Sequence, residues 1–215
     1  MAHVADKIVT TPAVGTHDDV RIRTDAVGWI AANNASGIYS VKYGGTRRHV
    51  QAASVVTGTG KLIRIGTRSR KTSSGYHLLG LLVGSEGTLG IATEITLSLA
   101  GLPQASQRGA FTFLSEKSAV TAIASMMKFG VDLAAVEFLD TRSIAALNRF
   151  GNFGLQKCPS LFIEVHGSTT TVREIFDTAA ELCKENHGKR INLPNGRNPW
   201  DIRHFTTRAI EGLDP

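Results

Sequence analysis

The segment best suited to chemistry is glycine-rich and spans Gly84–Gly90, with the sequence GSEGTLG. Its glycines let another group approach the backbone closely, and the hydroxyls of Ser85 and Thr88 can bind the polar groups of a cofactor. The spacing differs from the dinucleotide fingerprint, which needs two glycines two apart between a strand and a helix. A tight turn is the alternative use of these residues.

A second segment rich in small and polar residues is Asn33–Gly37, with the sequence NNASG. The small residues from Ala31 onward permit close approach of a flat group, which Asn34 and Ser36 could hydrogen-bond. An ordinary polar loop is the alternative. The Gly58–Lys61 segment, GTGK, is not a phosphate-binding P-loop, because a leucine follows where that motif needs Ser or Thr to bind magnesium.

Other reactive side chains show no pattern typical of a catalytic or metal site. The seven histidines lack metal-ligand spacing, and we expect His166, beside Glu164, to be structural. Cys158 and Cys183 are expected to be unpaired core or surface residues in a reducing compartment. We expect the segment Trp200–Arg203 to be short and exposed.

The composition is that of a folded protein with a core. Hydrophobic residues make up 42% of the 215 residues and charged residues 20%, which excludes wholesale disorder. The longest apolar stretch, Leu78–Gly84, is too short for a membrane helix. The N-terminal sequence resembles neither a secretory signal nor a transit peptide.

Positive charge is concentrated between Arg21 and Lys71, where ten Lys or Arg residues accompany Asp25 alone. The net charge of this window is +9. Because the net charge of the whole chain is +6, the remaining residues carry −3. Such a window suits a polyanion, either a nucleic acid or the pyrophosphate of a dinucleotide. An ordinary surface is the alternative. Because no recognition motif accompanies the basic residues, we predict no nucleic-acid partner; a basic binding module centred on residues 42–71 remains the rival hypothesis.

The first half of the chain indicates strands separated by glycines. Val50–Val56 and Leu62–Ile65 predict a hairpin. Alternation over Ile91–Leu99 predicts a strand with Ile91, Ile95, Leu97 and Leu99 on one face. The composition changes at Pro103, so we place a domain boundary between residues 1–102 and 103–215.

The second half alternates strands and helices. Strands are expected at 110–114, 134–139, 161–165 and 191–193, and helices at 118–129 and 141–150. Thr171–Glu174 has the form of a capping box at the start of another helix, which Gly188 would end. This order predicts an α+β fold with an antiparallel, ferredoxin-like sheet that carries its helices on one side.

Several separated motifs together resemble one family. The sequences KTSSGYHL at 71–78, LVGSEGTLGIATE at 82–94 and VGWIAANNASG at 27–37 resemble FAD-linked oxidoreductases with a flavin domain of the vanillyl-alcohol-oxidase (PCMH) type. VEFLD at 136–140, PSLFIEVHGS at 159–168 and WDIRH at 200–204 are similar to the substrate-capping domain of the D-lactate dehydrogenase (cytochrome) and glycolate oxidase subunit group. The resemblance covers about residues 25–207.

The resemblance implies a fold and a reaction. Residues 1–102 would be the C-terminal half of a PCMH-type FAD-binding domain, and residues 103–215 part of the ferredoxin-like capping domain. FAD would accept a hydride equivalent from C2 of a D-2-hydroxy acid, most simply D-lactate, and pass electrons to an acceptor such as cytochrome c. A relative that oxidises glycolate or 2-hydroxyglutarate is the alternative. If the source is eukaryotic, the resemblance implies a mitochondrial location, and otherwise a cytoplasmic one.

The resemblance also implies site residues. Arg203 lies where the family offers an arginine to the substrate carboxylate, although a surface ion pair is the alternative. The implied FAD-binding residues are Gly28, Ala31, Asn34, Ser36, Gly37, Tyr43, Gly84, Ser85, Glu86, Gly87, Thr88, Gly90 and Ile91.

The sequence departs from the family pattern in three ways. Met1–Asp25 lacks the family's glycine-rich pyrophosphate loop, and the paired histidines that bind a divalent metal do not occur before Pro215. Trp29 replaces a usual glycine and would hinder the flavin, and Arg48 and His49 replace an Asp-Asn pair. We therefore expect a truncated family member with no metal site, weak FAD binding and little turnover. The rival hypothesis is a non-catalytic remnant that self-associates through an exposed sheet edge.

Overall fold

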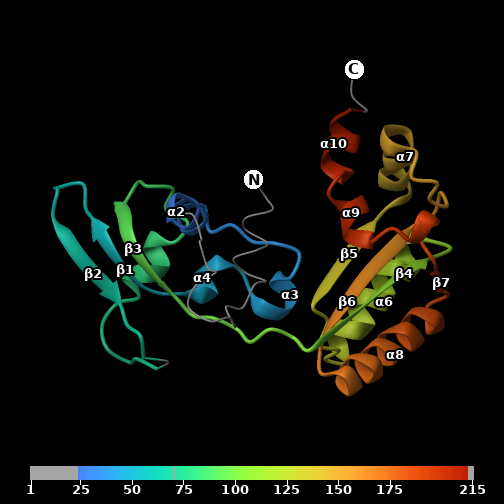
Figure 1. The fold of residues 1–215 in the computed structure, drawn as a ribbon, viewed down its shortest axis with the longest axis horizontal. Coiled ribbons are helices and arrows are strands. Elements are labelled where there is room, and N and C mark those ends of the chain that lie inside the picture. The colour runs from blue at the N-terminus through green and yellow to red at the C-terminus, as the bar shows by residue number, and fades with distance from the viewer. Residues whose placement is uncertain (1–23, 70, 213–215) are drawn as a thin grey trace. The chain divides into compact units, whose positions relative to one another are not determined.

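The computed structural model describes residues 24–69 and 71–212 (Figure 1). The chain divides into two compact units, Met1–Leu102 and Pro103–Pro215. We call them unit 1 and unit 2 and describe each by itself. The predicted identities of the two domains stay predictions. Most of Met1–Asp25, for which we expected no pyrophosphate loop, lies outside the described residues.

Unit 1 contains a three-stranded antiparallel sheet. Its strands are β1 (Val50–Val56), β2 (Leu62–Gly66) and β3 (Ile91–Leu97), in the order β2-β1-β3. The predicted hairpin is confirmed: β1 and β2 pair with each other, and the backbone N–H of Gly60 donates to the oxygen of Thr57 at 2.9 Å in the connecting turn.

The described part of unit 1 contains four helices beside this sheet: α2 (Thr24–Asn33), α3 (Ser40–Tyr43), α4 (Thr46–His49) and α5 (Leu78–Leu82). The core of unit 1 is small. It consists of Ala31, Val50, Ala53, Val55, Leu79 and Val83, with Ile65, Leu82, Ile95 and Leu97 packed against it.

The prediction of one apolar face along 91–99 is only partly right. Ile95 and Leu97 pack on the core, whereas Ile91 is 68% exposed and Leu99, beyond the strand end, is 61% exposed. For Ile91 the reason is a β-bulge. Ser54 pairs with Glu94 and Val55 with Ala92, so Thr93 is skipped, and the alternation of side chains reverses there.

Unit 2 contains a four-stranded antiparallel sheet in the order β5-β6-β4-β7. Its strands are β4 (Ala105–Thr112), β5 (Ala135–Leu139), β6 (Ser160–Gly167) and β7 (Lys189–Ile191). The helices α6 (Glu116–Lys128), α7 (Thr141–Gly151) and α8 (Thr169–Glu185) connect them. This is the ferredoxin-like arrangement, and the predicted fold class is confirmed.

Helix ends in unit 2 are set by side-chain caps. Ser115, Asp140 and Ser168 each accept a hydrogen bond from the backbone N–H three residues later. The capping box predicted at Thr171–Glu174 was wrong, because Ser168 supplies the cap and α8 begins at Thr169. Gly188 lies after the helix end and donates to the oxygen of Cys183 at 2.8 Å.

The core of unit 2 lies between the sheet and the helices α6 and α8 (Figure 1). Leu161, Ile163 and Val165 of β6 face this core. The opposite face is also covered: Glu164, which alternates with them, accepts a hydrogen bond from Trp200 of α9 (Pro199–Arg203). Helices therefore lie on both faces, not on one as expected.

The exposed character expected for 200–203 is also wrong. Trp200 is 4% exposed and Ile202 is fully buried. The chain reaches this helix through a 3-10 turn, η1 (Pro194–Gly196), and continues into α10 (Thr206–Glu211), which packs on α7. Among the helices that the structure describes, none has the length and apolar character of a membrane span.

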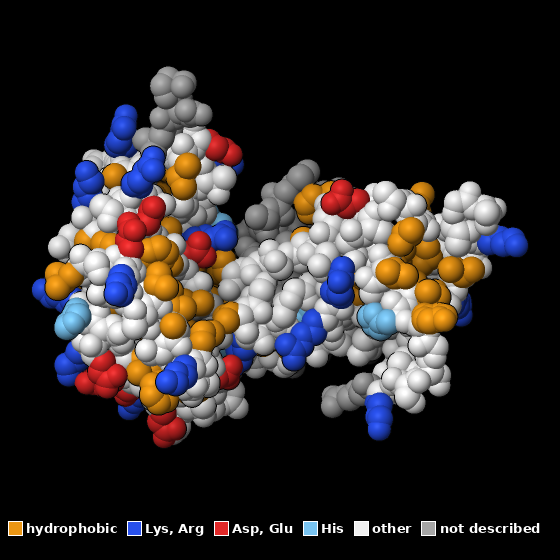
Figure 2. All heavy atoms as spheres, turned by 180° about the vertical axis from the view of Figure 1, so that it is seen from behind, with side chains coloured by type: hydrophobic (Ala, Val, Ile, Leu, Met, Phe, Trp, Pro, Cys, Tyr) orange, Lys and Arg blue, Asp and Glu red, His pale blue; other side chains and the backbone are white. Residues whose placement is uncertain are grey.

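Side chains on the surface are mixed in character. Figure 2 shows hydrophobic side chains gathered on unit 1, at the right of that view, and its exposed residues include Leu62, Leu81 and Leu89.

Candidate functional site

A cavity of about 310 Å³ lies in unit 1 between α2, the sheet and the glycine-rich segment. Of the two segments that the sequence singled out, Gly84–Gly90 forms part of the wall, whereas no residue of Asn33–Gly37 lines the cavity, and α2 supplies the facing wall instead. Its lining residues are Gly28, Trp29, Ala31, Ala32, Val50, Ala53, Leu82, Val83, Ser85, Gly87, Gly90, Ile91, Ala92 and Ile95. The structure thus brings together Gly28, Ala31, Ser85, Gly87, Gly90 and Ile91 of the predicted FAD-binding residues.

Backbone hydrogen bonds join the two wall segments. The N–H of Gly84 donates to the oxygen of Ala31, and the N–H of Glu86 donates to the oxygen of Ala32, both at 3.0 Å. These carbonyls belong to the last turn of α2, whose terminal carbonyls have no partner within the helix. The glycine-rich segment therefore serves as the cap that α2 requires, and the wall of the cavity is held in place.

Arg47 of α4 adds a second connection. Its backbone N–H donates to Asn34 Oδ1 at 3.0 Å, and its guanidinium Nη2 donates to the oxygen of Val83 at 2.8 Å. Asn34 has a left-handed backbone with φ 49°, which asparagine tolerates well. Its side-chain oxygen therefore has a structural partner beside the cavity.

The backbone of the glycine-rich segment is left-handed at several positions. Gly84, Glu86 and Gly87 have φ values of 89°, 52° and 81°. A Cβ atom on Gly87 would meet nothing within 4 Å, so this residue leaves open space in the cavity wall. A Cβ atom on Gly90 would lie 2.7 Å from the carbonyl oxygen of Val56, so glycine is required there for packing.

The other predicted cofactor residues do not line the cavity. Thr88 Oγ1 donates to the oxygen of Ser85 at 2.6 Å, and the oxygen of Gly37 accepts from Ser40 Oγ at 2.5 Å. The oxygen of Tyr43 lies 2.9 Å from His49 Nε2. Ser36 lies near Gly45, outside the lining. Their predicted role in FAD binding is untested.

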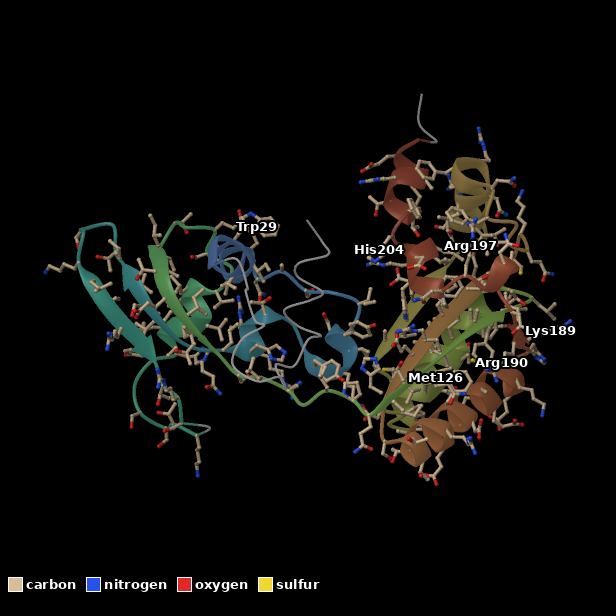
Figure 3. All side chains as sticks on the ribbon, viewed as in Figure 1. Trp29, Met126, Lys189, Arg190, Arg197 and His204 are labelled. Atoms are coloured by element: carbon tan, nitrogen blue, oxygen red, sulfur yellow. The ribbon has the colours of Figure 1, made fainter. Side chains whose placement is uncertain are left out.

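Trp29 is positioned differently from what the sequence suggested. Residues up to Asn33 form α2, so the expected loop begins only after the helix. The Trp29 side chain, labelled in Figure 3, is 51% exposed and lines the cavity. The indole contributes to the wall of the cavity, and its hindrance of the flavin stays a prediction.

Unit 2 contains a buried charged cluster that the sequence did not predict. Glu164 is fully buried; its Oε1 lies 2.9 Å from His166 Nε2 and its Oε2 lies 3.0 Å from Arg108 Nε. The indole N–H of Trp200 also donates to Oε2. Burial alone would raise the pKa of Glu164, but the hydrogen bonds from His166 and Arg108 outweigh it and hold the pKa below its usual range.

Arg203 lies at the end of α9 and is about one third exposed. Its Nε lies 3.4 Å from Glu137 Oε2 of β5. This ion pair is the alternative that the sequence left open, and a role at the substrate carboxylate stays a prediction.

Cysteines and metal-ligating groups show no site in the part of the chain that the structure describes. Burial raises the pKa of the Cys183 thiol to about 12, and it also raises the pKa of Cys158. No group of three or more His, Cys, Asp or Glu side chains that could hold a metal ion occurs among residues 24–69 and 71–212.

Comparison with known proteins identifies the class. Residues 102–213 match the family described as FAD linked oxidases, C-terminal domain. The chain therefore belongs to the FAD-linked oxidase family, and the predicted family resemblance is confirmed.

Three curated relatives show which FAD-linked oxidases the chain is similar to. A probable mitochondrial D-lactate dehydrogenase of Danio rerio is 37% identical over 86% of this chain and 39% of that protein. The mitochondrial D-lactate dehydrogenase (cytochrome) of Arabidopsis thaliana is 36% identical over 88% of this chain and 34% of that protein. Glycolate oxidase subunit GlcD of Bacillus subtilis is 29% identical over 78% of this chain and 36% of that protein. The chain thus spans well under half the length of these relatives.

Solved structures support the fold. Alkyldihydroxyacetonephosphate synthase is similar with a TM-score of 0.66 over 86% of this chain and 36% of that one, at 22% identity. p-Cresol methylhydroxylase gives a TM-score of 0.61 over 82% of this chain and 40% of that one, at 13% identity. At these identities the likeness concerns the fold alone.

Proposed function

We propose that the chain is part of an FAD-dependent dehydrogenase that oxidises a D-2-hydroxy acid, first of all D-lactate, to the 2-oxo acid. The observation that carries this proposal is the cavity of about 310 Å³ in unit 1, whose walls include Gly28, Ser85 and Gly87. Membership of the FAD-linked oxidase family supports the cofactor, and the names of the relatives support the substrate class.

The cavity suits part of a flavin nucleotide. Its lining is mostly apolar, and Gly28 and Gly87 have no side chain that would occupy the cavity. A flat ring system can lie against such a wall, with the hydroxyl of Ser85 as a polar contact. When bound, FAD supplies the redox chemistry, as the acceptor of a hydride equivalent from C2 of the hydroxy acid.

The protein's own contribution is to bind and orient. Arg203 is proposed to bind the substrate carboxylate, since a guanidinium offers two parallel N–H donors to a carboxylate. Arg203 Nε lies 3.4 Å from the carboxylate oxygen Oε2 of Glu137. Substrate would thus exchange one carboxylate partner of Arg203 for another.

The finer assignments are proposals too. We propose a cytochrome, such as cytochrome c, as acceptor and a mitochondrial location in a eukaryote; the word cytochrome in the name of the Arabidopsis relative and the word mitochondrial in both names support this. Glycolate is the alternative substrate, since a glycolate oxidase subunit is among the relatives. Weak binding of FAD and low turnover by the 215-residue chain stay predictions.

The test is an equilibrium titration of the chain with FAD, followed by anaerobic addition of D-lactate or L-lactate. We expect weak but saturable binding, and only slow bleaching of the flavin absorbance, by D-lactate and not by L-lactate. Gly87→Val should abolish binding, because it places a branched side chain in the cavity at a left-handed position. Gly60→Val is the matched control, since Gly60 also has a left-handed backbone, with φ 77°, and its Cβ would also meet nothing within 4 Å. If Gly87→Val bound FAD with unaltered affinity, the cavity would not be part of the FAD-binding site.

A second candidate function is self-association through β2. This strand lies at the edge of the unit 1 sheet, and its residues Leu62 and Ile63 are 63% and 39% exposed. An edge strand with exposed apolar side chains favours pairing with another chain. Sedimentation should then show a concentration-dependent dimer that Ile63→Lys abolishes, and a monodisperse monomer at high concentration would refute it.

A further inference from the structure

The sheet of unit 1 has two faces of different character. Ala53 and Val55 of β1, which lies between β2 and β3 (Figure 1), belong to the core of this unit. Ala52, Ser54 and Val56 alternate with them along the strand, so these side chains lie on the opposite face. Strand pairing fixes which residues of β2 and β3 share this second face.

Three rows of side chains cross the second face, and each row has one residue from β2, one from β1 and one from β3. The rows are Leu62, Val56 and Ile91; Arg64, Ser54 and Glu94; and Gly66, Ala52 and Thr96. We call this surface the open face. Its first row depends on the bulge at Thr93, since without the skipped residue Ile91 would lie on the core side.

The first row is an exposed apolar patch. Leu62 is 63% exposed and Ile91 is 68% exposed, and the two flank Val56. Because the three side chains are neighbours in one row, their apolar surfaces are contiguous. Contiguous apolar surface on a folded chain indicates an interaction site.

The second row gives the open face two sides of opposite charge. Ser54 lies in the middle, and its hydroxyl donates to Glu94 Oε2 at 2.7 Å. Arg64 lies on the other side of Ser54, two strand spacings or about 10 Å from Glu94 along the row. Neither Arg64 nor Glu94 forms an ion pair with a side chain of residues 24–69 and 71–212. The open face is therefore positive along β2 and negative along β3.

A recess of about 400 Å³ lies over the second and third rows, and its lining includes Arg64, Ser54, Glu94 and Gly66. Gly66 and its strand neighbour Ala52 have too little side chain to fill the space beside the charged row. Two sheets that pack face to face lie about 10 Å apart. The recess thus offers room for the long charged side chains of an opposing sheet.

We infer that the open face binds the open face of a second copy of this chain, in a dimer whose two-fold axis is parallel to β1. Rotation about this axis exchanges the β2 and β3 sides. It therefore places Leu62 of one copy opposite Ile91 of the other, and Arg64 opposite Glu94, each of them twice. An axis perpendicular to the strands would instead place Arg64 opposite Arg64, so the charges select one geometry.

The contact is small. The open face is three strands wide and three rows long, so a dimer through it buries less than the roughly 1,200 Å² of a standard interface. We therefore expect a reversible dimer with a Kd on the order of tens of micromolar. The inference does not rest on the proposed function. It also differs from pairing through the edge of β2, in which the backbone of that strand would contact the other chain.

The test is sedimentation equilibrium of the whole chain, at protein concentrations up to at least tenfold above the expected Kd. We expect a monomer–dimer equilibrium that added salt weakens. Arg64→Glu and Glu94→Arg should each raise the Kd at least tenfold, because each places like charges opposite one another in the dimer. An equal mixture of the two variants should restore dimers, since every charged pair between unlike copies is then complementary.

A matched pair of variants on β2 separates the open face from the strand edge. Leu62 lies on the open face, whereas the adjacent Ile63 pairs with the core residue Val55 and lies on the other face. Leu62→Lys should abolish the dimer, and Ile63→Lys should change its Kd less than twofold. A monomer at the highest concentration, failure of the mixture to restore dimers, or loss of the dimer in Ile63→Lys but not in Leu62→Lys would overturn the inference.

Discussion

The indole N–H of Trp200 donates a hydrogen bond to the buried carboxylate of Glu164, which fixes α9 to the central strand β6. From this point the helix reaches β5, where Arg203 meets Glu137. The position of the candidate substrate-binding arginine thus depends on a hydrogen bond in the interior of unit 2.

Trp200→Phe tests how much this hydrogen bond stabilises unit 2. The substitution keeps an aromatic ring but removes the donor, which leaves a buried carboxylate oxygen with one partner fewer. We expect unit 2 to lose about 1–3 kcal/mol of stability in urea unfolding. Trp29→Phe is the control, since Trp29 is half-exposed, and it should change stability by less than about 0.5 kcal/mol. Equal stability of the two variants would show that the Glu164 bond contributes little.

The stability of unit 2 should depend on the ionisation of Glu164. Its pKa in the folded chain is lowered from the ordinary 4.5, chiefly because the hydrogen bonds from His166 and Arg108 outweigh burial. The stability that this carboxylate contributes is therefore present above pH 4.5 and is lost as the pH falls through the lower folded-state value.

Glu164→Gln provides the measurement. The difference in unfolding free energy between the wild type and this variant should be constant near neutral pH and should shrink below pH 4.5. Glu174→Gln, an exposed position on α8, should show no such change. A difference that stays constant down to about pH 3 would contradict the lowered pKa.

Gly90→Ala should destabilise unit 1. The Gly90 backbone has φ 152°, and a Cβ atom would lie 2.7 Å from the carbonyl oxygen of Val56 and 2.8 Å from Val55 Cγ1. Because the backbone of β1 cannot move aside without disturbing its pairing with β3, we expect the free energy of unfolding of unit 1 to fall by about 2 kcal/mol or more. Gly58→Ala, in open space, should be nearly neutral. A neutral Gly90→Ala would mean that β1 and β3 separate easily.

Local patterns predicted much of the fold. The hairpin of β1 and β2 and the order of strands and helices in unit 2 depend on short-range periodicity, which the sequence displays directly. The bulge at Thr93 was missed because alternation assumes continuous pairing, and only the register with β1 reveals the skipped residue. Ser168 was missed as a cap because Thr171 fits the same pattern three residues later.

The candidate sites show the same contrast between local signals, which the sequence displays, and contacts between distant segments, which it does not. The glycine-rich segment and the small residues Ala31 and Ala32 are each visible as short stretches of sequence, and the structure brings the two stretches together in the wall of one cavity. The Glu164 cluster combines side chains from distant segments. Pairing of β4 with β6 places Arg108 beside Glu164, and α9 brings Trp200 to the same carboxylate. The one local signal was the spacing of Glu164 and His166, which places both on the same face of a strand.

Trp29 should report directly on the cavity of unit 1. Since its indole lines the cavity and Trp200 is buried in unit 2, FAD should quench the fluorescence of Trp29 selectively. If the indole stacks on a ring of the cofactor, Trp29→Ala should weaken FAD binding by about 1–3 kcal/mol. Trp29→Phe should retain most of the affinity and lose the quenching. Tighter FAD binding by Trp29→Ala would mean instead that the indole hinders the cofactor, as its replacement of a glycine first suggested.

Arg203→Ala separates substrate binding from cofactor binding. The alanine variant loses the guanidinium that we propose binds the substrate carboxylate, and charged hydrogen bonds of this kind contribute about 1.5–3 kcal/mol. The D-lactate concentration for half-maximal flavin bleaching should therefore rise at least tenfold, while the Kd for FAD changes less than twofold. Arg142→Ala on α7 removes the same charge elsewhere in unit 2 and should leave both values unaltered. Equal loss of FAD and D-lactate binding in Arg203→Ala would show that the ion pair with Glu137 is structural, and the arginine would then have no place at the substrate.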